Sequence, residues 1–357
     1  MKNTAASLLF ISAIVFSAGV PEAQRRGGAP PGAGGPGRGG RGGASTIERI
    51  TVHGKALEGN LEGDSPDRAV AVYLPPSYAA DQNRRFPTVY LLLGSGASES
   101  AVAGFVQQSG DRLAGAQGFS EFIVVIPNAS TLHGGSMYSN SVTTGDWERY
   151  IAEDLVGYID SHYRTLAQRM SRGIAGHSMG GYGALRIGMK HPQVFANLYA
   201  MSACCAGPLD NVPATQLTND EATAMAAAWS PNPKAPPLFL DAPVRDGKVR
   251  PEIIAKWNAN ALAEMLPQHA SNLNLYYAIA LDVGTADGLL DQNRQLHQAM
   301  TKLRIPHTFE EYDGDHANRI PERIERNVLP FFARHLAAPA NLTAPSPPAD
   351  RLSTSGR

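Results

Sequence analysis

One pentapeptide constrains this chain more than any other feature of its sequence: Gly176-His177-Ser178-Met179-Gly180, the chain's only match to G-x-S-x-G. A short apolar segment precedes it, and a pattern rich in glycine and alanine follows it over residues 179–190. Small residues are needed on both sides of a sharp turn from a buried strand into a helix, because the backbone approaches itself closely there. The motif therefore predicts a strand, a tight turn with Ser178 at its tip, and a helix whose first turn stabilises negative charge beside that serine.

Segments typical of strands and of helices alternate through most of the chain. Short continuous apolar runs indicate strands that are buried on both faces, and apolar residues spaced three or four apart indicate helices. We expect strands at residues 88–93, 122–126, 172–176, 195–202, 275–281 and 307–312, and helices at residues 147–163, 179–190, 289–303 and 320–335. This order predicts an α/β fold with a mostly parallel central sheet and helices on both faces. An active site would lie beyond the carboxyl ends of the strands.

Two further segments depart from this alternation. Residues 47–58 and 68–74 predict an antiparallel lead-in before the first parallel strand. Residues 206–250 are rich in proline, alanine and aspartate, so we expect them to form a short cap insertion over the sheet. Aromatic side chains in and beside this insertion would line a small apolar pocket, and Trp147 and Trp257 are the candidate substrate-binding residues.

The two ends of the chain differ from its middle in composition. Lys2, an apolar run over residues 5–18 and small residues up to Ala23 predict a signal peptide at residues 1–23. The run is shorter than the ~20 apolar residues of a membrane span, although an uncleaved anchor is the alternative. Residues 24–44, rich in glycine, proline and arginine, predict a disordered linker, and residues 337–357 a disordered tail. Residues 45–336 would form the folded domain of a secreted or periplasmic protein.

The charge balance excludes some classes of partner. Lysine and arginine number 31 against 32 acidic residues, a net charge of -1, so no strong overall attraction to nucleic acid or anionic lipid is expected. We expect a small-molecule ester as partner, no nucleic acid and no membrane after signal cleavage, and the oligomeric state stays open. The only two cysteines, Cys204 and Cys205, are adjacent, which excludes a disulfide framework. A vicinal disulfide and two free thiols remain open alternatives.

A serine hydroxyl is a poor nucleophile unless a base takes its proton. His316 is the candidate base, because it alone of the histidines after Ser178 follows the end of a predicted strand in a loop. The acid that orients the base should lie in the loop after the preceding strand. Asp287 is best placed there, with Asp282 and Asp291 as rivals.

Negative charge that develops on a substrate oxygen needs backbone N–H donors. Met179, directly after the serine, is one candidate for this oxyanion hole, and Ser95 in the loop after residues 88–93 is the other. The acidic residues beside His316 could suggest a metal site. No cluster of partner ligands with suitable spacing accompanies them in the sequence, so we expect neither a metal nor another cofactor.

Two long stretches resemble a known family. Residues 140–183, which end in RGIAGHSMGGYG, and residues 284–324, which begin GTADGLLDQNRQ, resemble the putative-esterase family of α/β hydrolases. That family includes S-formylglutathione hydrolases, feruloyl esterases, siderophore esterases and mycolyltransferases. The resemblance covers most of residues 68–336 and implies the α/β-hydrolase fold with Ser178, Asp287 and His316 as its triad. Leu93 departs from the pattern, since many members carry His or Asp before the glycine of the oxyanion loop.

The sequence therefore predicts a serine esterase that hydrolyses a carboxylic ester with a short-chain or aromatic acyl group, through an acyl-enzyme on Ser178. Acyl transfer to a sugar or another alcohol is the runner-up, because it would use the same triad. A noncatalytic binding protein on a hydrolase scaffold is a further alternative, against which the complete set of Ser178, Asp287 and His316 argues.

Overall fold

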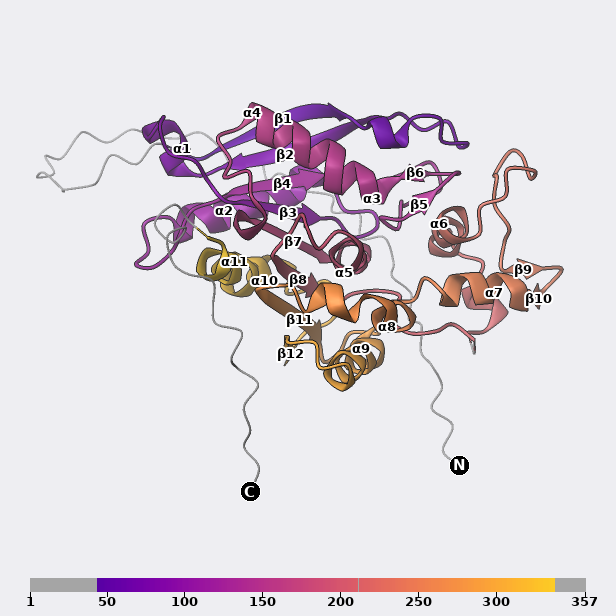
Figure 1. The fold of residues 1–357 in the computed structure, drawn as a ribbon. Coiled ribbons are helices and arrows are strands. Elements are labelled where there is room, and N and C mark those ends of the chain that lie inside the picture. Colours follow the sequence, from indigo (N-terminus) through magenta and orange to yellow (C-terminus); the bar gives the residue numbers. More distant parts are fainter. Residues whose placement is uncertain (1–43, 211, 338–357) are drawn as a thin grey trace, which may run out of the picture.

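The computed structural model describes residues 44–210 and 212–337. Their central element is an eight-stranded sheet (Figure 1). The expected signal peptide, all of the expected linker except residue 44, and the expected tail from residue 338 onward lie outside the described residues. In spatial order the strands are β1 (Thr46–His53), β2 (Asp67–Leu74), β4 (Ile123–Pro127), β3 (Thr88–Leu92), β7 (Arg172–His177), β8 (Asn197–Met201), β11 (Ala278–Gly284) and β12 (Thr308–Tyr312).

The pairing of the strands confirms the predicted mostly parallel sheet. From β4 to β12 each strand runs parallel to its neighbours, whereas β1 pairs antiparallel with β2, and β2 pairs antiparallel with β4. Because all the parallel strands point the same way, the loops after β3, β4, β7, β8, β11 and β12 leave the sheet at one edge. That edge is where Ser178, Asp287 and His316 converge.

Side chains along each strand alternate between two hydrophobic cores, as the pleat of a strand requires. In β2, for example, Val70 and Val72 belong to one core, and Ala71 and Tyr73 belong to the other. The first core lies under the larger set of helices: α3 (Trp147–Arg149), α4 (Val156–His162), α5 (Met179–Lys190), α8 (Leu262–Leu273) and α9 (Leu290–Lys302). The second lies under α2 (Glu99–Leu113), α10 (Ile320–Arg323) and α11 (Leu329–His335).

Both long helices at the borders of these cores are interrupted. The expected helix over residues 147–163 consists of α3, a π-helical segment at Tyr150–Leu155 and α4. The expected closing helix likewise contains a π-helical segment at Ile324–Val328 between α10 and α11. The shorter helical elements are α1 (Pro76–Ala80) and 3-10 turns at Lys55–Leu57, Arg169–Ser171 and Ala214–Gln216. Within the described ranges, no helix has both the length and the apolar character needed to cross a membrane.

One strand boundary differs from the sequence prediction in a way that matters for the site. The apolar run at residues 275–281 predicted a strand, but β11 spans Ala278–Gly284. Leu275 and Tyr277 are 61% and 53% exposed, because they belong to the surface turn between α8 and β11. The prediction was wrong by three residues at each end, and Asp282 consequently lies inside the strand and not after it.

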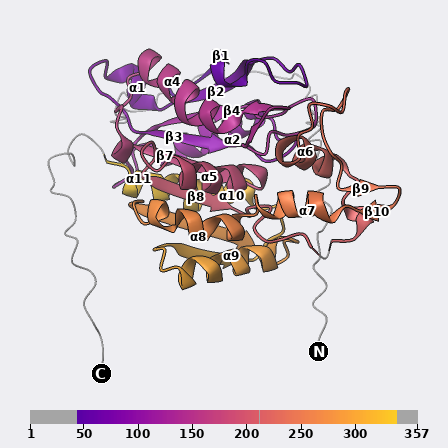
Figure 2. The same cartoon turned by 45° about the vertical axis from the view of Figure 1, so that its right-hand side comes forward.

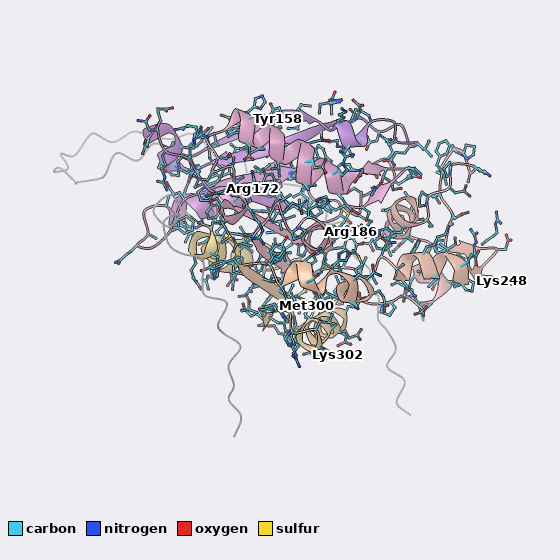
Figure 3. The ribbon with its side chains drawn as sticks, in the orientation of Figure 1. Tyr158, Arg172, Arg186, Lys248, Met300 and Lys302 are labelled. Atoms are coloured by element: carbon cyan, nitrogen blue, oxygen red, sulfur yellow. The ribbon has the colours of Figure 1, made fainter. Side chains whose placement is uncertain are left out.

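The expected insertion at residues 206–250 lies within a longer segment between β8 and α8, which Figure 2 shows at one side of the sheet. It contains α6 (Asp220–Trp229), a hairpin of β9 (Val244–Arg245) and β10 (Lys248–Val249), and α7 (Pro251–Asn258). Lys248, labelled in Figure 3, lies at its outer end.

Three hydrogen bonds join this insertion to the segment around the small antiparallel pair β5 (Asn140–Ser141) and β6 (Gly145–Asp146). Trp229 Nε1 donates to Ser139 Oγ at 3.0 Å. Ser141 Oγ donates to the Ala227 carbonyl at 2.6 Å, and Thr143 Oγ1 donates to the Phe239 carbonyl at 2.6 Å. The insertion is therefore held by short hydroxyl side chains of residues 139–143.

Candidate active site

Ser178 lies at the sharp turn between β7 and α5, which confirms the predicted strand, turn and helix. Its backbone has φ 57° and ψ -118°, a conformation that is strained for a residue with a side chain. The turn needs glycine on both sides: a Cβ atom on Gly176 would collide with the Gly180 backbone, and one on Gly180 would collide with the Leu92 carbonyl. The small residues of the motif thus let β7, α5 and β3 meet at one point.

The far end of α5 is anchored by a buried ion pair. Arg186, near the centre of the molecule in Figure 3, donates from Nε to Glu148 Oε1 at 2.8 Å, and Lys190 Nζ lies 2.9 Å from the same oxygen. Burial alone would raise the pKa of Glu148, but the two cations lower it below its usual value. Glu148 is therefore held as a carboxylate, and it fixes the helix that carries Ser178 to α3.

The structure brings Ser178, His316 and Asp287 into one line of hydrogen bonds. His316, in the loop after β12, has Nε2 3.0 Å from Ser178 Oγ. Its Nδ1 lies 2.9 Å from Asp287 Oδ2, and Asp287 occupies the loop after β11. The Asp287 side chain is 1% exposed, whereas the His316 side chain is 19% exposed. The carboxylate thus lies beneath the imidazole, and the imidazole lies between the carboxylate and the serine.

Asp287 has a second fixed contact. Its Oδ1 accepts a hydrogen bond from the Leu289 N–H at 2.8 Å, so its two oxygens have different donors. Burial alone would raise the pKa of Asp287, but the hydrogen bond and the positive charge of His316, together with the Leu289 N–H, bring that pKa below its usual value. Asp287 is therefore ionised at neutral pH and can stabilise a protonated His316.

The two rival acids lie elsewhere. Asp282 is fully buried in β11, where it accepts from Arg323 at 2.7 Å and from Tyr199 Oη at 2.8 Å, and burial raises its pKa to about 6. Asp291 lies on α9 with its side chain 85% exposed, 3.8 Å from Arg294. Neither contacts His316.

The two oxyanion candidates lie together beside Ser178. A Cβ atom on Gly94 would lie 3.2 Å from Ser178 Cβ, so the loop after β3 passes directly against the serine. In that loop Ser95 Oγ lies 3.6 Å from Met179 Sδ. Met179 is the first residue of α5, and the N–H groups of a first helical turn have no partner within the helix. Ser95 and Met179 are therefore in contact with each other, in the two segments that flank Ser178.

Tyr138 holds this loop in place, although no motif in the sequence marks it. The fully buried Tyr138 Oη accepts from the Leu93 N–H at 2.8 Å and donates to the Leu93 carbonyl at 3.1 Å. One phenol therefore satisfies both backbone groups of the residue that precedes Gly94. This contact takes place at Leu93, the position at which the sequence departs from the family pattern.

Two further titratable side chains interact with His316, one by contact and one through its charge. His177 has Nε2 2.8 Å from the His316 carbonyl oxygen and donates to it, and burial lowers the pKa of His177 to about 3. Glu221, in the first turn of α6, has its pKa raised by burial while the charge of His316 opposes that rise. His177 thus supports the His316 loop as a neutral donor, and Glu221 brings the insertion into the electrostatic environment of His316.

The family model described as putative esterase matches residues 65–320 of the chain. The chain belongs to this esterase family. Among curated relatives, an esterase of Mycobacterium tuberculosis is 33% identical over 132 residues, which are 36% of this chain and 27% of the relative. Mouse S-formylglutathione hydrolase is 29% identical over 155 residues, 38% of this chain and 51% of that enzyme. The chain thus spans at most about half the length of these relatives.

Solved structures of esterases share the fold over a larger part of the chain. A ferulic acid esterase is 26% identical with a TM-score of 0.64, and the match covers 82% of this chain and 99% of that one. An S-formylglutathione hydrolase from Agrobacterium tumefaciens is 19% identical with a TM-score of 0.59, with 82% and 96% of the two chains covered. The second likeness shows the α/β-hydrolase fold alone.

The two tryptophans expected to contact substrate are core residues. Trp147 is 1% exposed, donates from Nε1 to the Thr144 carbonyl at 2.8 Å and lies under the Arg68 guanidinium. Trp257 is fully buried and packs edge-on against Trp229. Apolar burial places both rings inside the protein, so the expectation that they line a substrate pocket is wrong.

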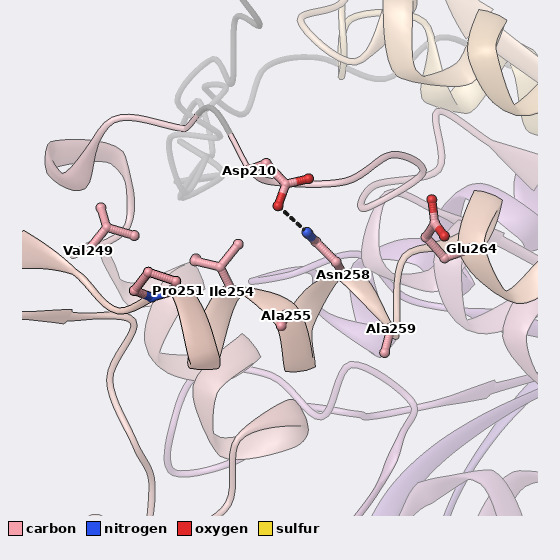
Figure 4. A pocket seen from close by; sticks show the side chains of 8 residues that line it. All are labelled: Asp210, Val249, Pro251, Ile254, Ala255, Asn258, Ala259 and Glu264. Carbon is pink, nitrogen blue, oxygen red and sulfur yellow. Dashed lines mark hydrogen bonds between the residues drawn. The ribbon is translucent and has the colours of Figure 1, made fainter.

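Small residues instead pack closely against Met179. A Cβ atom on Gly135, in the loop after β4, would lie 2.8 Å from Met179 Sδ and 3.8 Å from Ala224 of α6. A separate hollow of about 410 Å³ lies in the insertion between Asp210 and α7 (Figure 4). Its lining includes Ile254 and Asn258, and Asn258 Nδ2 donates to Asp210 Oδ1 at 2.7 Å. Ser178, His316 and Asp287 are not among the residues that line that hollow.

Proposed function

We propose that this member of the esterase family is a serine esterase that hydrolyses a carboxylic ester through an acyl-enzyme on Ser178. The observation that carries the proposal is the continuous line from Ser178 Oγ through His316 to Asp287, with distances of 3.0 and 2.9 Å. A nucleophile within reach of a base that is itself oriented by an acid is the arrangement that activates a serine.

Each residue has a defined part in the proposed reaction. His316 Nε2 takes the proton of Ser178 Oγ as the oxygen attacks the ester carbonyl carbon. The N–H groups of Ser95 and Met179 donate to the carbonyl oxygen as it becomes negative. His316 then gives its proton to the alkoxide, which leaves as an alcohol. In the second half, His316 takes a proton from water, hydroxide attacks the acyl carbon, and Ser178 leaves with the proton returned from His316.

The proposed substrates are esters with short-chain or aromatic acyl groups. Gly135 packs tightly against Met179, so a long acyl chain would have to displace this contact, and the ferulic acid esterase with 26% identity points to an aromatic acyl group. We also propose that the enzyme works after export, on the basis of the signal-peptide pattern at residues 1–23. Water is the proposed acceptor of the acyl group, and an alcohol is the alternative acceptor with the same Ser178 chemistry.

A panel of esters tests this function. The purified protein is assayed with p-nitrophenyl esters of increasing chain length, a feruloyl ester and an acetylated sugar, each beside Ser178→Ala. We expect the short-chain or feruloyl esters to give the highest kcat/KM and the variant to be inactive on all of them. A preference for long chains would overturn the proposed acyl specificity, and equal activity of Ser178→Ala would overturn the mechanism.

The choice between water and an alcohol needs a separate measurement. A short-chain ester is supplied with and without a sugar or glycerol, and free acid is counted against transferred ester. Mostly free acid supports hydrolysis. Mostly transferred ester at modest acceptor concentration would identify the protein as an acyltransferase.

A further inference from the structure

Two neighbouring thiols lie directly behind the nucleophile. Cys204 and Cys205 follow β8, and both are free cysteines. Cys205 Sγ lies 3.2 Å from Cys204 Sγ, within hydrogen-bond distance of two thiols. Cys204 is buried and Cys205 is partly exposed, so Cys205 is the more accessible residue of the pair.

The same two residues are joined to the nucleophile through their backbone. The Cys204 N–H donates to the Ser178 carbonyl at 3.2 Å. On the other side, the Leu262 N–H donates to the Cys205 carbonyl at 3.1 Å. Cys205 has φ 54°, a left-handed conformation that is uncommon for a residue with a side chain. A change in the backbone of this dipeptide is therefore transmitted to the turn that holds Ser178.

We propose that Cys204 and Cys205 form a reversible oxidation site, at which a hydroperoxide converts the two thiols into a vicinal disulfide and thereby lowers turnover at Ser178. The site is distinct from the triad of Ser178, His316 and Asp287, because within the described residues neither sulfur contacts any of these three side chains. The effect on turnover rests on the proposed esterase function, whereas the thiol chemistry does not.

The chemistry proceeds in two steps. The partly exposed Cys205, as its thiolate, attacks one oxygen of the hydroperoxide. The O–O bond breaks, Cys205 becomes a sulfenic acid, and the other oxygen leaves as an alcohol after taking a proton. The Cys204 sulfur then attacks the Cys205 sulfur, the S–O bond breaks, and water leaves with the Cys204 proton. The two sulfurs supply the two electrons that reduce the peroxide.

The position of the second thiol favours formation of a disulfide over further oxidation of Cys205. Cys204 lies 3.2 Å from the sulfur that becomes oxidised, so it can resolve the sulfenic acid before a second peroxide arrives. The hydrogen bond with Cys205, together with burial and the charge of Glu221, raises the pKa of the Cys204 thiol. The buried sulfur is therefore the resolving partner, and the exposed one reacts first.

The product should be readily reversible. Cα atoms of adjacent residues are ~3.8 Å apart, which is below the ~4.4–6.8 Å usual for a disulfide. Strained disulfides are the easily reduced ones. Closing the ring also moves the Cys204 Cα and with it the N–H that bonds to the Ser178 carbonyl. We expect kcat to fall about tenfold on oxidation, and a thiol reductant to restore it.

The test uses the full chain as it is purified, exposed to hydrogen peroxide or an organic hydroperoxide. Free thiols are counted in denaturant, the intact mass is measured, and the peptide that contains both cysteines is mapped. We expect the free thiols to fall from two to none, with a mass loss of about 2 Da for the two hydrogens and no dimer. Turnover of a short-chain ester is followed in parallel, before and after treatment with dithiothreitol.

Cys205→Ser is the matched control, because its hydroxyl replaces the partly exposed sulfur and cannot form the bond. Its turnover should resist the peroxide dose that inactivates the natural chain. Persistence of both thiols, or oxygen added to a single cysteine, would overturn the site. Equal inactivation of Cys205→Ser, or unchanged turnover of the cross-linked chain, would overturn its coupling to Ser178. If the protein lacks esterase activity, the rate of fluorophosphonate labelling at Ser178 replaces turnover as the readout.

Discussion

Replacing Asp287 with asparagine tests the line of hydrogen bonds at Ser178 most sharply, because the new side chain has almost the same shape. Asp287 Oδ1 accepts from the Leu289 N–H at 2.8 Å. In Asp287→Asn the amide oxygen must stay on that side, so the NH₂ group faces His316 Nδ1. Nδ1 must then accept a hydrogen bond, and the imidazole carries its proton on Nε2, which faces Ser178. That tautomer cannot take the serine proton.

The expected loss is large. A wrong tautomer of the base costs roughly 10⁴-fold in kcat in a serine protease, and a factor of this size corresponds to about 5 kcal/mol of transition-state stabilisation. The assay is kcat for a short-chain p-nitrophenyl ester near neutral pH, together with the thermal unfolding midpoint. We expect kcat to fall by about this factor, while the fold survives because the shape and the Leu289 contact are kept.

Two matched variants control for the loss of a carboxylate as such. Asp291→Asn alters a side chain that is 85% exposed, so its kcat should stay within about twofold of the natural protein. Asp282→Asn weakens a buried contact with Arg323. It should lower the free energy of unfolding by about 1–3 kcal/mol, and its effect on kcat should be the smaller one when both are expressed as free energies. A folded Asp287→Asn variant that keeps more than about a hundredth of the natural kcat, against the far larger loss argued above, would refute this reasoning.

Three further predictions concern the neighbours of that line. Ser178→Ala should abolish ester turnover without lowering the unfolding midpoint, and a fluorophosphonate should label Ser178 in the natural protein, so labelling at another residue would contradict the assignment. Tyr138→Phe removes the hydroxyl that bonds to both backbone groups of Leu93. It should reduce kcat roughly five- to a hundredfold because the oxyanion loop loses its support. An unchanged kcat would show that the loop keeps its position without this hydroxyl. Burial lowers the pKa of His177 to about 3, whereas the unfolded chain binds that proton below about pH 6.5. Acid therefore favours the unfolded state, and the free energy of unfolding should fall by up to about 1.4 kcal/mol per pH unit between these two values. Urea unfolding at a series of pH values checks this, His177→Gln should flatten the slope, and stability that rises on acidification would speak against a buried neutral ring.

The fold was largely predictable because its strands are short, apolar and separated by helical patterns, and this order leaves few arrangements. The grouping of Ser178, Asp287 and His316 was predictable as well, since all three follow parallel strands that end at one edge of the sheet. Tyr138 was not predictable. Its backbone has φ 42°, and no motif marks a phenol that folds back onto a distant loop.

The errors have a common physical origin. An apolar run shows that residues are buried or paired, but not where pairing begins, so β11 was placed three residues early. A tryptophan near an insertion could line a cavity or fill the core. Trp147 and Trp257 are close to fully buried, because their large apolar rings gain more from packing between helices than from contact with solvent.

The three hydroxyl contacts between residues 139–143 and the insertion bear on how this scaffold could acquire a new specificity. The insertion rests on Ser139, Ser141 and Thr143. Two of the three partners are backbone carbonyls, so a graft of residues 206–250 from a relative keeps these bonds only if it places the same carbonyls and an indole N–H against residues 139–143. The two segments are far apart in the sequence, but a functional chimera should exchange them together. α5 and its anchor at Glu148 lie outside that unit, so the chemistry at Ser178 could stay constant while the paired segments are replaced.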